Sequence, residues 1–234
     1  MRALVFDTSA VISISANNLL EVLFALKQHF QGEFFISPAV KRELIDNPLH
    51  TRRFELQAVL LADFIAKGSL KFLQHLAVEH KAAELTDVIN RIFSINGKPL
   101  SIVDPAEVEG LVLAKMLKAE AYVIDERTLR LLVEDYHNLV RLFERKFGMR
   151  VGVDKSALHG FQDFLGDVHI LRSAELMTVA FELGLFHGYL DGKQLIRDYE
   201  KKMLEGILWG LRLRGCAIST REIEDVLKLE RFNK

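Results

Sequence analysis

The sequence predicts an α/β fold in which a central parallel sheet is flanked by helices, and two observations carry this prediction. Three short apolar runs rich in β-prone residues occur at ALVF (3–6), EFFIS (33–37) and AYVI (121–124). Short continuous runs of this kind are typical of strands that are covered on both faces. Amphipathic helical segments separate the runs, and this alternation favours parallel strands joined by right-handed crossovers.

The helical segments of the first hundred residues share an apolar spacing of three and four positions, which predicts amphipathic helices that pack on the sheet. They are 17–30, a helix that Ser37 caps and Pro38 opens, and two helices within 49–96 that end at Gly68 and Gly97, with a possible short strand at 67–73. Serine at the cap and proline at the first helical position together fix the start of the helix that follows the second strand.

A further helix is expected from Asp104 to about residue 119, and one long helix closed by Gly148 is expected after the strand at 121–124. Beyond it the pattern is weaker and predicts short strands and helices, namely strands within 149–153 and 168–171 and helices within 173–184, 191–215 and 219–230. We therefore divide the chain into an α/β domain over 1–150 and a mainly helical C-terminal extension over 151–234 that docks on it.

Composition limits the classes of protein that need to be considered. The 234 residues are 50% hydrophobic, which is ample for a core, and the net charge of −1 means that any nucleic-acid contact must rest on a local basic patch. Cys216 is the single cysteine and there is no CxxC or HExxH pattern, which disfavours disulfides, secretion and structural zinc. No stretch approaches the roughly 18 apolar residues of a membrane span. We expect a soluble, cytoplasmic protein with no membrane association.

Four acidic residues fall at strand-to-helix edges of the predicted fold. Asp7 follows the first strand, Glu43 lies within two turns of the helix after the second strand, Glu107 lies in the first turn of the helix that begins at Asp104, and Asp125 ends the strand at 121–124. The carboxyl ends of parallel strands form a crevice in which ligands bind, so these carboxylates are expected to converge.

Four neighbouring carboxylates repel one another and raise each other's pKa unless a cation neutralises them. Mg²⁺ and Mn²⁺ prefer oxygen ligands and bridge protein carboxylates to substrate phosphates. A bound water made more acidic by such an ion attacks a phosphodiester in line. The pattern therefore predicts a metal-dependent nuclease that uses Mg²⁺ or Mn²⁺.

Each acid taken singly also has a structural explanation. Asp7 and Asp125 could cap the helices that follow them, and Glu43 could lie on a solvated helix face where the helix dipole favours it. Asp104 and Glu107 together read as a capping box. The prediction of a site therefore rests on the joint placement of the four acids.

Four segments in this order, LVFDTSAVI, FFISPAVKREL, LSIVDPAEVEGLVLAKML and AYVIDERTLR, resemble the signature blocks of the PIN-domain family, which includes many prokaryotic toxin ribonucleases of the VapC type. The resemblance covers about residues 1 to 150. It implies a PIN-like three-layer fold and a metal-dependent endoribonuclease that hydrolyses single-stranded RNA. It also implies a possible toxin of a toxin–antitoxin pair, with an antitoxin protein as partner and a homodimer as the assembly.

The resemblance also assigns residues. It implies that Asp7, Glu43, Glu107 and Asp125 are the catalytic acids and metal ligands, and that Thr8 supports the first of them. The family interval before the last acid selects Glu107 over Asp104. The segment LRLRGCAISTREIEDVLK further resembles the C-terminal end of an uncharacterised PIN-like branch found in archaea and bacteria.

Two positions depart from the usual family pattern. The third acid is usually aspartate, whereas this chain has Glu107, and Val123 stands where many members have threonine. Arg127 and Arg130, beside the last acid, are candidates for binding substrate phosphates together with Thr8. The alternative function is a catalytically silent PIN-like module that binds RNA or a protein partner.

Overall fold

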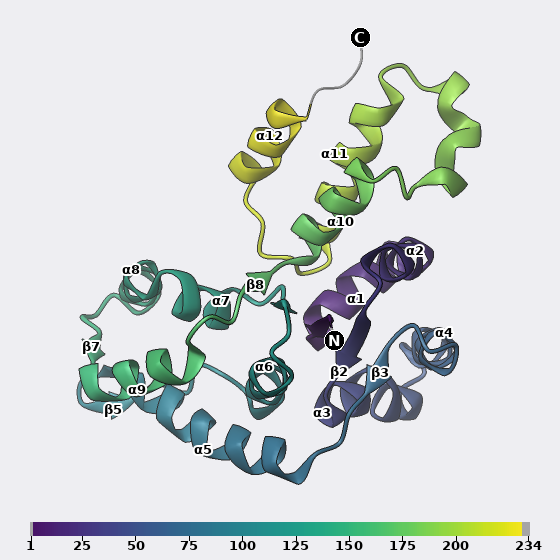
Figure 1. The fold of residues 1–234 in the computed structure, drawn as a ribbon. Helices are drawn as coiled ribbons and strands as arrows, with labels where there is room; N and C mark the ends of the chain where they lie inside the picture. The colour runs from purple at the N-terminus through teal and green to yellow at the C-terminus, as the bar shows by residue number, and fades with distance from the viewer. Residues whose placement is uncertain (1, 231–234) are drawn as a thin grey trace.

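The computed structural model describes residues 2–230. Its centre is a five-stranded parallel sheet in the order β3-β2-β1-β6-β8 (Figure 1). The strands are β1 (Ala3–Phe6), β2 (Glu33–Ile36), β3 (Lys71–Phe72), β6 (Ala121–Val123) and β8 (Ile170–Leu171). The predicted α/β class, with a central parallel sheet flanked by helices, is confirmed.

The two central strands, β1 and β6, set the register of the sheet. Phe6 pairs with Val123, and the backbone N–H of Asp7 donates to the carbonyl of Val123 at 2.8 Å. Successive side chains of a strand point to opposite faces. Accordingly, Phe6 and Val123 belong to the hydrophobic core on one face, whereas Val5 and Tyr122 belong to the core on the other.

Helices cover both faces and give three layers. The first face is covered by α1 (Thr8–Ala16), α2 (Leu20–Phe30), α4 (Glu55–Ala66), α10 (Ser173–Glu182), α11 (Tyr199–Leu213) and α12 (Thr220–Leu229). The second face is covered by α5 (Leu76–Ile92), α6 (Pro105–Leu117), α7 (Arg127–Glu134), α8 (Tyr136–Phe147) and α9 (Lys155–Leu165).

The part of the chain after residue 150 is built into these layers. Strand β8 extends the central sheet beside β6, and α9 packs on the second face against α5. Helices α10 and α11 contact α1 on the first face, and Figure 1 places them with α12 beyond α1 and α2. Among residues 2–230, no helix is both long enough and apolar enough to span a bilayer.

Three helices differ from the prediction. Helix α5 stops at Ile92, because Asn96 and Gly97 adopt φ values of 52° and 76° and turn the chain into a hairpin. An Asn-Gly pair favours this turn. The hairpin joins β4 (Phe93–Ile95) to β5 (Lys98–Pro99), and β7 (Gly152–Val153) pairs with β4 to complete a small antiparallel sheet.

The predicted long helix after β6 is two helices, α7 and α8, because Asp135 leaves the helical conformation with φ −156° and ψ 77°. Its carboxylate accepts from the N–H of Asn138 at 3.1 Å and caps α8. Likewise, the expected helix over 191–215 consists of a 3₁₀ segment, η3 (His187–Leu195), followed by α11.

A glycine in α6 allows this helix to approach the sheet closely. A Cβ added at Gly110 would lie 2.5 Å from the hydroxyl oxygen of Tyr122. We predict that Gly110→Ala lowers the free energy of unfolding by about 1–3 kcal/mol through overpacking. For a chain of this length, each 1 kcal/mol corresponds to about 2–4 °C in melting temperature, which circular dichroism measures.

Gly206→Ala is the matched control. Gly206 is an exposed helical residue of α11. Among residues 2–230, an added Cβ would have no atom within 4 Å other than its chain neighbours and the backbone of its own helix. Alanine there should raise stability by about 0.5–1 kcal/mol through helix propensity. Equal effects at the two glycines would contradict the close approach of α6 to Tyr122.

Candidate functional site

Asp7 is held firmly at the carboxyl edge of the sheet. It follows β1 directly and caps α1, and only 3% of its surface is exposed. Its carboxylate accepts from the backbone N–H of Ser9 at 2.8 Å, from the Ser9 hydroxyl, and from the Tyr122 hydroxyl at 3.3 Å. These contacts fix the orientation of a buried acid.

Glu43 comes from the helical segment after β2. Ser37 caps α3 (Pro38–Lys41) and accepts from the N–H of Val40 at 3.3 Å, as the sequence predicted. The segment then widens into a π-helical turn, η1 (Arg42–Asp46), a feature that is frequent at functional sites. Glu43 is half-buried in this turn, and its carboxylate accepts a hydrogen bond from the hydroxyl of Thr8. This bond brings Glu43 to the residue that follows Asp7.

Glu107 takes part in the capping box at the start of α6, and its backbone also contacts Tyr122. The N–H of Asp104 donates to its carboxylate at 3.1 Å, and the N–H of Ala106 donates to Asp104 at 2.8 Å, so the predicted capping box of α6 is present. The single proton of the Tyr122 hydroxyl is shared between the backbone carbonyl of Glu107 at 2.9 Å and the carboxylate of Asp7 at 3.3 Å. Tyr122 therefore touches both Asp7 and Glu107, and it joins the first strand to the start of α6.

Burial and repulsion both act on Asp7. Burial raises the pKa of Asp7 to about 6, although its hydrogen bonds from Ser9 oppose the shift. The negative charge of Glu43 contributes to this increase. Because charges interact strongly only at short range, Asp7 and Glu43 belong to one electrostatic cluster.

The same forces act more strongly on Glu107. Burial raises the pKa of Glu107 to about 8, against the opposing hydrogen bond from the backbone of Asp104. The charges of Glu126 and Asp7 add to the increase. Asp7 thus interacts electrostatically with both Glu43 and Glu107. We call these three residues the acid cluster, and Glu126 lies at its border.

Asp125 is directed elsewhere. It is fully buried, and its two carboxylate oxygens accept from the N–H of Ser173 at 2.8 Å and from the Ser173 hydroxyl at 2.6 Å. Ser173 begins α10, which covers the first face of the sheet. Phe6 and Val123 are paired and therefore point to the same face of the sheet. Because successive residues point to opposite faces, Asp7, one position after Phe6, and Asp125, two positions after Val123, point to opposite faces.

The predicted substrate-binding residues have different surroundings. Thr8 is half-buried and hydrogen-bonded to Glu43. Arg127 is exposed at the first position of α7, beside the carboxyl edge. Arg130 is turned to Glu134, with which it forms an ion pair at 2.7 Å.

Three residues that orient or connect parts of the candidate site were not identified from the sequence. Tyr122 orients Asp7, Glu126 caps α7 by accepting from the N–H of Leu129 at 2.8 Å, and the buried Glu109 accepts from the N–H of Ala39 at 3.0 Å. The last bond joins α6 to the helix that leads to Glu43. Knowledge that Phe6 pairs with Val123 would have identified Tyr122 and Glu126 as neighbours of Asp7. By the alternation of side chains along a strand, both belong to the face of the sheet to which Asp7 points.

The donor types of the acid cluster fit a hard divalent cation, because all are carboxylate oxygens. Asp7, Glu43 and Glu107 are the residues that would hold it. Within residues 2–230, no group of three or more His, Cys, Asp or Glu side chains is arranged so that it could hold a metal ion. In the conformation described, Asp7 is hydrogen-bonded to Ser9 and Tyr122, and Glu43 to Thr8.

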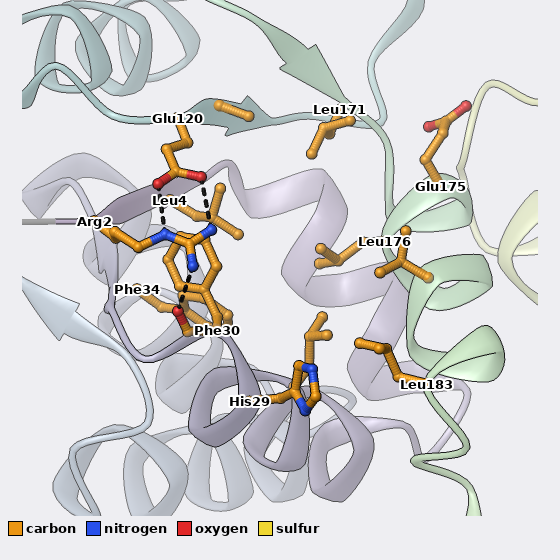
Figure 2. Close-up of a pocket in the computed structure, with 13 residues that line it drawn as sticks. Arg2, Leu4, His29, Phe30, Phe34, Glu120, Leu171, Glu175, Leu176 and Leu183 are labelled. Atoms are coloured by element: carbon orange, nitrogen blue, oxygen red, sulfur yellow. Dashed lines mark hydrogen bonds and ion pairs between the residues drawn. The ribbon is translucent and has the colours of Figure 1, made fainter.

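A cavity of about 500 Å³ lies elsewhere, between α2 and α10 (Figure 2). Arg2 and Glu120 border it and form a bidentate ion pair, with N···O distances of 2.7 and 3.0 Å. Leu4 and Ala121 also line it, and they belong to the starts of β1 and β6. The cavity is therefore at the amino-terminal part of the sheet, away from the acid cluster.

Comparisons of the chain with protein-family models, with curated proteins and with solved structures found no match.

The raised pKa of Glu107 predicts a pH-dependent stability. Because the folded-state pKa of about 8 exceeds the ordinary value of 4.5, the folded state binds more protons, and stability falls as the pH rises between these values. Glu107→Gln removes the charge and can still accept from Asp104. We expect it to melt within a degree or so of wild type near pH 4.5 and several degrees higher at pH 8.

The measurement is differential scanning calorimetry across this pH range in the absence of divalent metal. Glu224→Gln, at an exposed position in α12, is the control and should follow the wild-type curve at every pH. A Glu107→Gln difference that stays constant from pH 4.5 to 8 would show that the carboxylate is not destabilised by its surroundings.

Proposed function

We propose that the protein is a metal-dependent nuclease whose active site is the acid cluster of Asp7, Glu43 and Glu107. The observation that carries the proposal is the gathering of these three acids at the carboxyl edge of a parallel sheet, through the hydrogen bonds of Thr8 and Tyr122. Burial there raises the pKa of both Asp7 and Glu107. This edge is where ligands of open α/β sheets bind. Burying acids together destabilises the fold, so their presence is best explained by a cation that compensates the charge.

The chemistry of the cluster supports Mg²⁺ or Mn²⁺ as the cation, because both ions prefer carboxylate oxygens. When bound, such an ion supplies an acidified water for attack on a phosphodiester and neutralises charge on the phosphoryl oxygens.

Neighbouring residues orient the carboxylates of the acid cluster. Ser9 and Tyr122 hold the carboxylate of Asp7 from two sides, which reduces the reorganisation that binding requires. The hydroxyl of Thr8, the residue after Asp7, donates to the carboxylate of Glu43, and the charge of Glu43 acts on Asp7. Burial of Asp7 lowers the local dielectric and strengthens its attraction for a cation.

Arginines near the cluster support a phosphate-containing substrate. Arg127 is exposed at the start of α7, and Arg42 is exposed next to Glu43. Their exposed guanidinium groups can contact phosphate oxygens, and such contacts position a nucleic acid without reading its sequence. Arg130 contributes less because Glu134 engages it.

The choice of single-stranded RNA as substrate rests on the resemblance of four sequence blocks to PIN-domain ribonucleases. The same resemblance is the basis for proposing an antitoxin partner, a homodimer and a cytoplasmic location. A protein that covers the carboxyl edge would block access to the acid cluster, which is how such a partner would inhibit it.

A second candidate function is a catalytically silent module that binds RNA or a protein partner. One observation favours it, namely that both carboxylate oxygens of Asp125 already accept hydrogen bonds from Ser173. Asp125 is the fourth acid of the family pattern, and in this arrangement it does not face the other three.

Incubation with end-labelled single-stranded RNA and Mn²⁺ tests the proposal. We expect the wild type to cleave, and Asp7→Asn and Glu43→Gln each to reduce the rate at least about 100-fold, since each removes a proposed ligand. Glu224→Gln is the control and should cleave at the wild-type rate. Chelation with EDTA should abolish cleavage.

Cleavage that persists in both Asp7→Asn and Glu43→Gln would indicate a contaminating nuclease and would contradict the proposal. RNA retention without cleavage, at any Mn²⁺ concentration, would instead favour the silent module. Circular dichroism of each variant establishes that a loss of activity is not a loss of folding.

A further inference from the structure

The carboxylate of Asp125 acts as a cap for a helix that is distant in sequence. Residue Arg172 stands at the N-cap position of α10, and its guanidinium has only hydrogen-bond donors. Asp125 supplies the missing acceptor. Its carboxylate oxygens accept hydrogen bonds from the N–H and from the hydroxyl of Ser173, the first residue of α10. A negative charge at a helix N-terminus is also favoured by the helix dipole.

The backbone of Asp125 makes two further connections. Its N–H donates to the hydroxyl oxygen of Ser9 at 3.0 Å, and the same hydroxyl donates to the carboxylate of Asp7. Its carbonyl accepts from the N–H of Ala217 at 3.1 Å, in the segment between α11 and α12. Asp125 is thus bonded to α10, to the connection before α12, and to the serine that orients Asp7.

A second buried residue strengthens the same junction. The guanidinium of Arg172 donates to the carbonyl of Ala217 at 2.9 Å and to Glu222 of α12 at 2.7 Å. It also pairs with Glu175 of α10. The start of α10, the connection at Ala217 and the first turn of α12 therefore meet at one point at the end of β6.

We infer that Asp125 is a positioning residue that fixes helices α10 to α12 on the sheet and is joined through Ser9 to Asp7, and that it is not a metal ligand. The attachment of the helices stands on the hydrogen bonds alone. The connection to catalysis rests on the proposed function.

Two physical arguments separate this role from metal binding. The strand alternation directs Asp125 to the face of α10 and Asp7 to the face of Tyr122. In addition, turning Asp125 toward the acid cluster would leave the buried N–H of Ser173 without its acceptor, and an unpaired buried donor is unfavourable.

Asp125→Asn distinguishes the two roles. The amide oxygen can still accept from the Ser173 N–H and the amide group can donate to its hydroxyl, so the junction should survive, whereas a metal ligand would be lost. We expect Asp125→Asn to keep the Mn²⁺-induced rise in melting temperature of the wild type, and Asp7→Asn to lose most of it. Loss of the Mn²⁺ response in a folded Asp125→Asn protein would overturn the inference.

Asp125→Ala and Ser173→Ala test the attachment by amide hydrogen exchange without metal. Both should accelerate exchange in α10 to α12 at least about 10-fold, and the double variant should add little to the larger single effect because the residues share hydrogen bonds. Asp87→Ala, at an exposed position of α5, is the control. Unchanged exchange in α10 to α12 in both single variants would overturn the inference.

The Mn²⁺ response and the hydrogen exchange distinguish failure of the nuclease proposal from failure of the positioning role of Asp125. If the wild type shows neither a Mn²⁺ response nor RNA cleavage, the nuclease proposal fails, and hydrogen exchange still decides whether Asp125 attaches the C-terminal helices.

Discussion

The parallel pairing of β1 with β6 places Phe6 opposite Val123, and the directions of the acids follow from this register. Asp7 is one residue beyond the pair and shares a face with Tyr122, whereas Asp125 is two residues beyond it and faces α10. A shift of one position in either strand would exchange these directions. Because both faces are buried by helices, the register is strongly specified, and so is the separation of the two aspartates.

The two aspartates illustrate opposite uses of a buried carboxylate. Asp125 accepts two hydrogen bonds from Ser173 at the start of a helix, and these bonds attach the helix to the end of β6. Asp7 also accepts hydrogen bonds, yet burial and the charge of Glu43 raise its pKa to about 6. The first arrangement serves the fold. The second is unfavourable for the isolated protein, which is typical of positions where function, and not stability, determines the residue.

The strands and their edges could be predicted from the sequence because their signals are local. The apolar runs before Asp7 and Asp125 and the cap at Ser37 each depend on a few neighbouring residues. The face to which Asp125 turns could not be predicted, because it depends on the register between strands more than a hundred residues apart. The hairpin at Asn96 was predicted as a helix end because glycine after an asparagine serves both structures, and only the pairing of β4 with β7 decides between them.

A crystal structure of the protein soaked in Mn²⁺, with anomalous scattering used to locate the ion, would show directly which acids bind metal. We expect an anomalous peak in contact with carboxylate oxygens of Asp7, Glu43 and Glu107, while Asp125 remains hydrogen-bonded to Ser173. A peak bound to Asp125, or an acid cluster without a peak at saturating Mn²⁺, would contradict this expectation.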